Sequence, residues 1–237
     1  MVAIDGKVAL VTGGRRGLGS ALVDELLTRG AAKVYSTARE QYTDPRAGVI
    51  GVALEVRDDA SVAALETVAA DVDIVINNAG ILLPGSLLTG DFDDIATTFD
   101  INALGPLRVV RTLAPALARN GGGAVVNVHS VLSWLAGSGA YGASKAAIWS
   151  LTNSLRVELR GQQTQVLGVH VGFIDTEMVA DIALPKTSPA DVATRVLDAL
   201  EAGAHEVLVD DVTAAGEILI DGTAYSAGDV THLRDRK

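Results

Sequence analysis

A tyrosine and a lysine stand four residues apart in this chain, at Tyr141 and Lys145. Residues i and i+4 share one face of a helix, so the two side chains can meet. A tyrosine hydroxyl can give a proton to an oxygen that gains negative charge, as a carbonyl oxygen does when hydride reaches its carbon. A cation about 5 Å away favours the phenolate by roughly 3 kcal/mol. This would lower the tyrosine pKa by about two units from its usual value of about 10. The alternative is a surface lysine one turn from a half-buried tyrosine.

A serine precedes this pair at the end of an apolar run. Ser130 stands where a strand should end, and a hydroxyl there can orient a substrate oxygen. Ser133 and Ser138 are rivals for the role. Ser130 is favoured because it keeps the position at the strand end.

A glycine-rich turn, TGGRRGLG at 12–19, lies between the first apolar run and the first helical pattern. Gly13, Gly17 and Gly19 have the spacing G-x-x-x-G-x-G, which differs from the generic G-x-G-x-x-G dinucleotide fingerprint. Glycines let the backbone turn tightly and approach a pyrophosphate, which then meets the positive end of the helix. The alternative is an ordinary turn, but its position between strand and helix favours a nucleotide site.

The elements that must position these residues alternate along the chain. Their apolar runs are continuous, which indicates strands buried on both faces of a parallel sheet. The alternation predicts an α/β, Rossmann-like, doubly wound fold of about seven strands, in a single domain over 1–237 with a frayed tail at 232–237. The predicted strands are 8–11, 33–37, 49–56, 73–77, 124–128, 166–171 and 206–209. The predicted helices are 18–29, 61–70 with Ser61 as N-cap, 92–119 broken near Gly105 and Pro106, 141–160 and 189–202.

Composition narrows the class of function. The net charge of −10 repels phosphate backbones and anionic membranes, so neither nucleic acid nor membrane is an expected partner. The absence of cysteine excludes disulfides, thiolate metal sites and cysteine nucleophiles, and the four histidines show no metal-ligand spacing. No apolar stretch approaches the ~18 residues of a membrane helix, and the start of the sequence does not read as a secretory signal. A cytoplasmic location is expected.

Over about 5–180 the chain resembles the short-chain dehydrogenase/reductase family. The resemblance rests on TGGRRGLG at 12–19, NNAG at 77–80, Asn102, Ser130, Y-x-x-x-K at 141–145 and GFIDT at 172–176. It implies an oxidoreductase that interconverts an alcohol and a ketone or aldehyde with a nicotinamide cofactor. Tyr141 would be the general acid and base, Lys145 would also hold the nicotinamide ribose, and Asn102 would hold a water in the proton relay.

The resemblance also implies the cofactor contacts. Asn78, Ala79 and Gly80 would run along the adenosine side of the cofactor, whereas Ile174 and Thr176 would contact its nicotinamide end. The complete expected set is Gly13, Arg15, Arg16, Gly17, Leu18, Gly19, Arg39, Glu55, Val56, Asn78, Ala79, Gly80, Tyr141, Lys145, Ile174 and Thr176.

The chain departs from the family pattern in three places. Glu55 and Val56 stand where the family usually has Asp-Val beside adenine, and Val171 replaces a frequent proline. Ser130 lies about two residues closer to the tyrosine than usual, which implies a shortened loop.

Two arginines favour NADP(H) over NAD(H), because arginine matches phosphate with paired donors. Arg16 precedes Gly17, and Arg39 follows the second predicted strand. By resemblance, NADP-using members keep a basic residue at these two places, and Ala38 stands where NAD-using members usually have aspartate. For Arg15 a solvated charged turn is the alternative.

Other interpretations of the whole chain stay open. One is the same fold with NAD(H), or with a C=N or C=C acceptor, and another is a catalytically silent nucleotide sensor. The expected substrate is a small, mainly hydrophobic carbonyl compound or alcohol, because the segment 178–188 is short and the candidate pocket walls are nearly all apolar. A homodimer or homotetramer is expected through the helices 92–119 and 141–160, and residues 218–220 are expected to cover a partner or the sheet edge.

Overall fold

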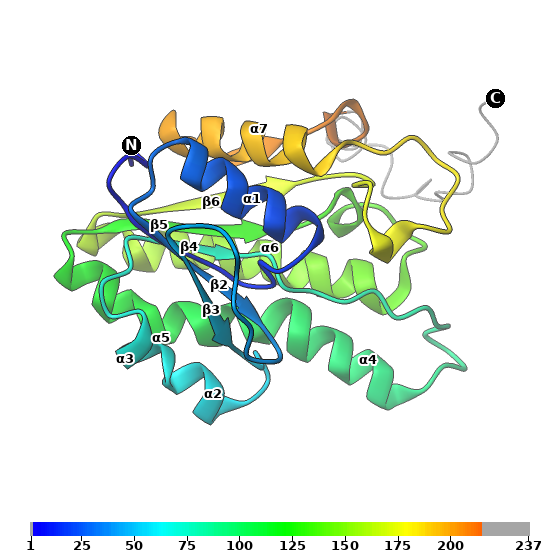
Figure 1. Ribbon diagram of the computed structural model, residues 1–237. Coiled ribbons are helices and arrows are strands. Elements are labelled where there is room, and N and C mark those ends of the chain that lie inside the picture. Colours follow the sequence, from blue (N-terminus) through cyan, green and yellow to red (C-terminus); the bar gives the residue numbers. More distant parts are fainter. Residues whose placement is uncertain (1, 215–237) are drawn as a thin grey trace.

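The computed structural model describes residues 2–214 as one seven-stranded parallel sheet with helices on both faces (Figure 1). The strand order is β3-β2-β1-β4-β5-β6-β7. The predicted Rossmann-like α/β fold is therefore confirmed. The expected tail at 232–237 and the apolar segment 218–220 lie outside the described residues.

The strands follow the predicted apolar runs. Their bounds are β1 Val8–Val11, β2 Lys33–Ala38, β3 Val49–Ala53, β4 Ile74–Asn77, β5 Gly123–Val128, β6 Thr164–His170 and β7 Glu206–Leu208. The chain order reverses between β1 and β4, which pair in parallel. In a doubly wound sheet, ligands bind outside the carboxyl ends of the strands at this switch point.

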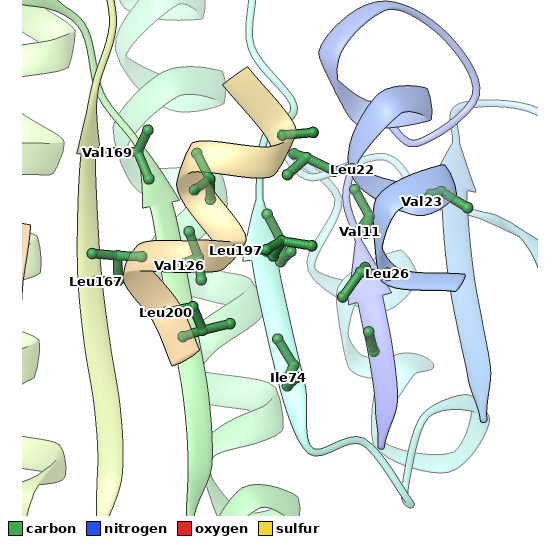
Figure 2. Packing of buried hydrophobic residues seen from close by; sticks show 14 of the residues in the cluster. Val11, Leu22, Val23, Leu26, Ile74, Val126, Leu167, Val169, Leu197 and Leu200 are labelled. Carbon is green, nitrogen blue, oxygen red and sulfur yellow. The ribbon is translucent and has the colours of Figure 1, made fainter. Parts of the chain in front are cut away.

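Two helices cover one face of the sheet, α1 (Gly17–Thr28) and α7 (Pro189–Glu201) (Figure 1). Leu22 and Leu26 of α1 and Leu197 and Leu200 of α7 are fully buried against the central strands (Figure 2). Burying one such side chain contributes ~1.5–3 kcal/mol. This packing fixes the start of α1, and with it the glycine turn.

The opposite face is covered by the long helices α5 and α6 together with several shorter ones (Figure 1). Its elements are α2 Asp59–Ala63, α3 Leu65–Val68, α4 Phe92–Phe99, the π-helix η1 Asp100–Leu104, α5 Gly105–Arg119 and α6 Gly139–Glu158. Three short 3₁₀ segments complete the described chain: η2 Val131–Ser133, η3 Leu159–Gln162 and η4 Glu177–Val179. Within 2–214, no helix is both long and apolar enough to cross a membrane.

Three predicted elements differ from the structure by more than a small shift at their ends. The helix expected over 61–70 is two short helices, α2 and α3, and α2 begins at Asp59 because the Asp58 carboxylate accepts from the Ser61 amide at 2.7 Å and caps it. The helix 92–119 does not break at Gly105 and Pro106: a π-turn carries it through, in which the Gly105 amide donates to the Asp100 carbonyl just before Pro106, which has no amide donor. The third strand ends at Ala53, before Val56.

Candidate active site

The residues singled out by sequence gather at the carboxyl edge of the sheet. The glycine turn follows β1, Arg39 follows β2, and Glu55 follows β3. The remaining predicted residues follow β4, β5 and β6 or lie on the helices beside them, at Asn78–Gly80, Asn102, Ser130, Tyr141, Lys145, Ile174 and Thr176. One edge therefore collects all of the candidates.

The glycine turn is shaped for close approach by a ligand. Gly13 and Gly17 have φ of +67° and +55°, the left-handed region that favours glycine. A Cβ at Gly19 would collide with the Gly13 carbonyl oxygen. Helix α1 begins at Gly17, so its amide groups and positive end face this turn. This cradle fits the pyrophosphate of a dinucleotide.

The loop after β4 is tied to the glycine turn. The Thr12 hydroxyl accepts from the backbone amides of Asn78 and Ala79, each at 3.0 Å. The Asn78 amide group donates to the Thr12 carbonyl at 3.0 Å. Asn78 therefore holds two cofactor-side loops together by its side chain.

The tyrosine and lysine lie together on the first turns of α6. Lys145 is 6% exposed, and its Nζ lies 5.7 Å from the centre of the Tyr141 ring. The same Nζ donates to the Val128 carbonyl at 2.9 Å, which anchors it to the end of β5. The predicted meeting of the pair on one helix face is seen in the structure.

The expected lowering of the tyrosine pKa is not seen. Burial raises the pKa of Tyr141 to about 12, and hydrogen bonding by the Ser130 side chain opposes this rise. Burial also lowers the pKa of Lys145 to about 8. Loss of hydration therefore dominates the pKa of both groups in the protein by itself. Tyr141 holds its proton at neutral pH, as a general acid must.

We predict that Lys145→Met raises the free energy of unfolding at pH 7. The lowered pKa of Lys145 means that burying the charged ammonium destabilises the folded protein by about 3 kcal/mol. The variant also loses the hydrogen bond to the Val128 carbonyl, so its net gain in the free energy of unfolding should be ~1–2 kcal/mol. Because the folded pKa of about 8 lies below the unfolded value of 10.5, the wild type gains stability as pH rises between these values. The advantage of Lys145→Met should shrink over this window. Denaturant unfolding of both proteins at pH 7 and about pH 10 measures it; an advantage that grows with pH would contradict the assignment.

Ser130 lies at the start of η2, directly after β5. Its Oγ accepts from the Leu132 amide at 3.1 Å, and its side chain also acts on Tyr141. The rival Ser133 has a buried hydroxyl with no hydrogen-bond partner within the described residues. Ser138 immediately precedes α6, and its side chain makes no capping bond to that helix. Of the three candidate serines, only Ser130 affects the pKa of Tyr141.

Asn102 lies in the π-helix η1 and is 1% exposed. Its amide oxygen accepts from the Ile81 amide at 2.9 Å, and its amide nitrogen donates to the Ile81 carbonyl at 2.9 Å and to the Ser144 hydroxyl at 3.1 Å. The side chain thus joins the loop after β4 to α6. Single π-turns inside helices frequently mark functional sites. The expected role of Asn102 in holding a water stays a prediction.

The cationic candidates differ in what they contact. Arg16 forms an exposed ion pair with Glu177 of η4. Arg15 lies over the Tyr42 ring, 5.4 Å from its centre. Arg39 is exposed and forms no ion pair within residues 2–214. Arg39 is therefore the one of these three whose guanidinium is not engaged by a described side chain.

The remaining cofactor candidates lie at the two ends of the edge. The Glu55 carboxylate accepts from the Arg57 amide at 3.1 Å, so it binds its own loop. Thr176 approaches the glycine turn: a Cβ on Gly17 would lie 3.3 Å from its methyl carbon. Sequence inspection had assigned no role to Ile81 or Val128, because each acts through its backbone and leaves no side-chain signal.

Comparison with known proteins gives consistent relatives. The chain is 30% identical to the 3-oxoacyl-[acyl-carrier-protein] reductase FabG of Salmonella typhimurium, over 98% of this chain and 97% of that protein. It is 34% identical to a crystal structure of a short chain dehydrogenase from Burkholderia cenocepacia in complex with NADP, with a TM-score of 0.89 and 98% coverage of both chains. A short chain dehydrogenase/reductase from Burkholderia phymatum in complex with NAD is 25% identical, with a TM-score of 0.81, over 100% of this chain and 98% of that one.

A family model described as short chain dehydrogenase matches residues 7–186. The matched range includes the glycine turn, Asn102, Ser130, Tyr141, Lys145 and Thr176. The chain belongs to the short-chain dehydrogenase/reductase family of oxidoreductases.

Proposed function

We propose that this protein is an NADP(H)-dependent oxidoreductase that interconverts an alcohol and a ketone or aldehyde. The observation that carries the proposal is the group of Ser130, Tyr141 and Lys145 at the carboxyl end of β5, beside a cradle that fits a dinucleotide pyrophosphate. A silent sensor has no need of a buried lysine anchored next to a protonated tyrosine. NADP(H) is favoured over NAD(H) because Arg39 has no described ion-pair partner and Ala38 puts no carboxylate at the end of β2.

The reaction needs one hydride and one proton. A bound nicotinamide would supply hydride to the carbonyl carbon in the reducing direction. The Tyr141 hydroxyl then donates its proton to the oxygen, and the Ser130 hydroxyl orients that oxygen. Lys145, whose pKa of about 8 allows exchange near neutral pH, returns a proton to Tyr141 or holds its charge. Lys145, Gly13, Gly19 and Asn78 would hold the cofactor.

The proposed substrate is uncharged and largely hydrophobic. Leu82 and Leu83 lie on the loop that follows β4, and Leu132 lies in η2, where its amide donates to Ser130 Oγ. Met178 is 48% exposed on η4, the short segment that follows β6. Mainly apolar pockets with few polar groups suit substrates of this kind. The Salmonella relative is named for an acyl-carrier substrate, so acyl thioesters belong in the test as the competing class.

The test is NADPH oxidation with a panel of neutral ketones and aldehydes, an acidic keto compound and a 3-oxoacyl thioester. We expect turnover with neutral ketones and a larger kcat/KM for NADPH than for NADH. Binding of NADPH without turnover across the panel would favour the sensor instead. Strong preference for the acidic compound or the thioester would overturn the proposed substrate class.

We predict that Ser130→Ala lowers kcat far more than Ser133→Ala. Ser130 acts on the Tyr141 hydroxyl, and loss of one such group at a developing charge costs about 10²-fold. The Ser133 hydroxyl has no described partner, so its removal leaves both rate and fold nearly unchanged. Steady-state kinetics on the two variants makes the comparison, and the reverse order would move the catalytic serine.

A further inference from the structure

A cluster of aromatic and polar side chains, with two buried histidines among them, lies where β5, β6 and β7 run side by side. We call it the histidine cluster; its members are His129, His170, Trp134, Trp149 and Glu206. His129 is 1% exposed and His170 is 0% exposed. Two fully buried imidazoles beside an active site need a physical reason, because burying polar rings carries a free-energy penalty unless their nitrogens are hydrogen-bonded.

The hydrogen bonds of the cluster have a defined direction. The Thr152 hydroxyl donates to the Ile148 carbonyl at 2.7 Å, which uses its one proton. His129 Nε2, 2.8 Å from that hydroxyl, must then be the donor to it. His129 Nδ1 is left as an acceptor, so His170 Nε2, 3.4 Å away, donates to it. Burial and the neighbouring cations lower the pKa of His129 well below its usual value, consistent with a neutral ring.

His170 also holds a tryptophan. The ring centres of His170 and Trp134 lie 4.0 Å apart with 24° between the planes, a stacked arrangement. Trp149 meets both rings edge-on, at 6.1 Å from His170 and 6.0 Å from Trp134. The indole N–H of Trp149 donates to Glu206 at 3.0 Å. Trp134 is thus clamped between a strand residue and a helix residue.

Trp134 ends the short turn that Ser130 begins. The Ser133 amide donates to the Ser130 carbonyl at 3.0 Å, and the Trp134 amide donates to the Val131 carbonyl at 3.1 Å. A displaced Trp134 would therefore pull on Ser130 through one tight turn. On the other side, Trp149 and Thr152 lie on α6, one and two turns beyond Lys145.

We propose that His170 is a positioning residue for Ser130. Its ring holds Trp134 and its Nε2 holds His129, so the turn that starts at Ser130 keeps a fixed place relative to the helix that carries Tyr141 and Lys145. His170 touches none of the reacting groups. The proposal rests on the proposed function for its effect on rate, although the placement of Trp134 can be measured without turnover.

Simple core filling explains the position less well. An apolar side chain would fill the site without hydrogen-bond requirements. His170 Nδ1, by contrast, is buried with no partner among the described residues, which costs free energy. The imidazole is instead suited to a flat face for Trp134 and a donor for His129 at the same time.

The test is a double-mutant cycle between His170 and Ser130. His170→Leu removes both ring stacking and the donor, and we expect it to lower kcat about 10- to 100-fold, as displacement of a reacting group by about 1 Å can do. In the Ser130→Ala background the same change should cost less than about threefold, because the serine it positions is already gone. His170→Phe keeps the flat ring and loses only the donor, so its kcat should fall less than that of His170→Leu and still lie below the wild type; it replaces His170→Leu in the cycle if that variant folds poorly. Equal losses in both backgrounds would overturn the proposal.

Two controls separate positioning from loss of fold and from failure of the proposed function. His205→Leu makes the same substitution at an exposed histidine and should change neither kcat nor the NADPH dissociation constant. The chain has two tryptophans, Trp134 and Trp149, and both contact His170. If the wild type reduces no carbonyl in the panel, the proposed function fails, and tryptophan emission still decides the placement. His170→Leu should shift the emission to longer wavelength and increase quenching by acrylamide; an unchanged spectrum would overturn the proposal.

Discussion

Tyr141→Phe is expected to remove turnover and to leave NADPH affinity nearly intact. The ring and its packing stay, and only the hydroxyl that gives the proton is lost. Proton transfer contributes about 10²-fold or more to rates of this kind, so the variant should keep less than about a hundredth of the wild-type kcat. Its cofactor dissociation constant, measured by NADPH fluorescence, should change less than about threefold, because the proposed cofactor contacts come mainly from the glycine turn and Lys145.

The matched control is Tyr35→Phe. Tyr35 is buried, 6% exposed, and its hydroxyl contacts Lys33 at 2.8 Å and Asp71 at 3.0 Å, away from the catalytic group. This variant should keep its rate. If Tyr141→Phe retains more than about a tenth of the wild-type rate, the general-acid assignment is wrong.

The direction of the reaction adds a second readout at Tyr141. With its pKa raised to about 12 by burial, the phenol is ready to donate a proton for carbonyl reduction at neutral pH. Alcohol oxidation needs the phenolate as base, so its rate should rise as pH rises, whereas the reduction rate should not.

Lys145→Ala should harm both turnover and cofactor affinity, since Lys145 is proposed to hold the ribose as well.

The sequence predicts well what depends on local pattern. The runs at 8–11 and 124–128 become strands because continuous apolar segments must be buried on both faces. Four-residue spacing brings Tyr141 and Lys145 onto one face of α6. It predicts poorly what depends on tertiary environment. The pKa of Tyr141 is raised and not lowered, because its largest cause is burial, which spacing does not reveal.

The contact between His129 and His170 shows the same limit. The two histidines lie 41 residues apart in sequence, and each ends an apolar run. The register of β5 and β6 pairs Val128 with Val169, which puts the next residues, His129 and His170, side by side. Only this pairing reveals that the two are more than separate core histidines. The oligomeric state and the cellular location stay predictions.

Arg39→Ala is expected to abolish the preference for NADPH. Arg39 is exposed just after β2, where the expected extra phosphate of NADPH would come closest to the sheet edge. A guanidinium can give that phosphate two charge-assisted hydrogen bonds, each worth about 1.5–3 kcal/mol. Taking about 3 kcal/mol for an exposed site, kcat/KM for NADPH should fall about 100-fold, while the value for NADH, which lacks the phosphate, should stay within about twofold.

Arg16→Ala should have a smaller effect on NADPH use than Arg39→Ala, because Arg16 already forms an ion pair with Glu177 and must leave it to reach the phosphate. The control is Arg119→Ala, which removes the same charge from an exposed site. Arg119 lies at the carboxyl end of α5, just before β5 starts, and so at the opposite edge of the sheet. It should change neither cofactor. Measuring kcat/KM for both cofactors at one ionic strength removes the effect of general screening. A similar loss of kcat/KM with NADH and NADPH, or no loss with either, would show that Arg39 does not bind the phosphate. A wild type that uses NADH as well as NADPH would contradict the proposed cofactor preference itself.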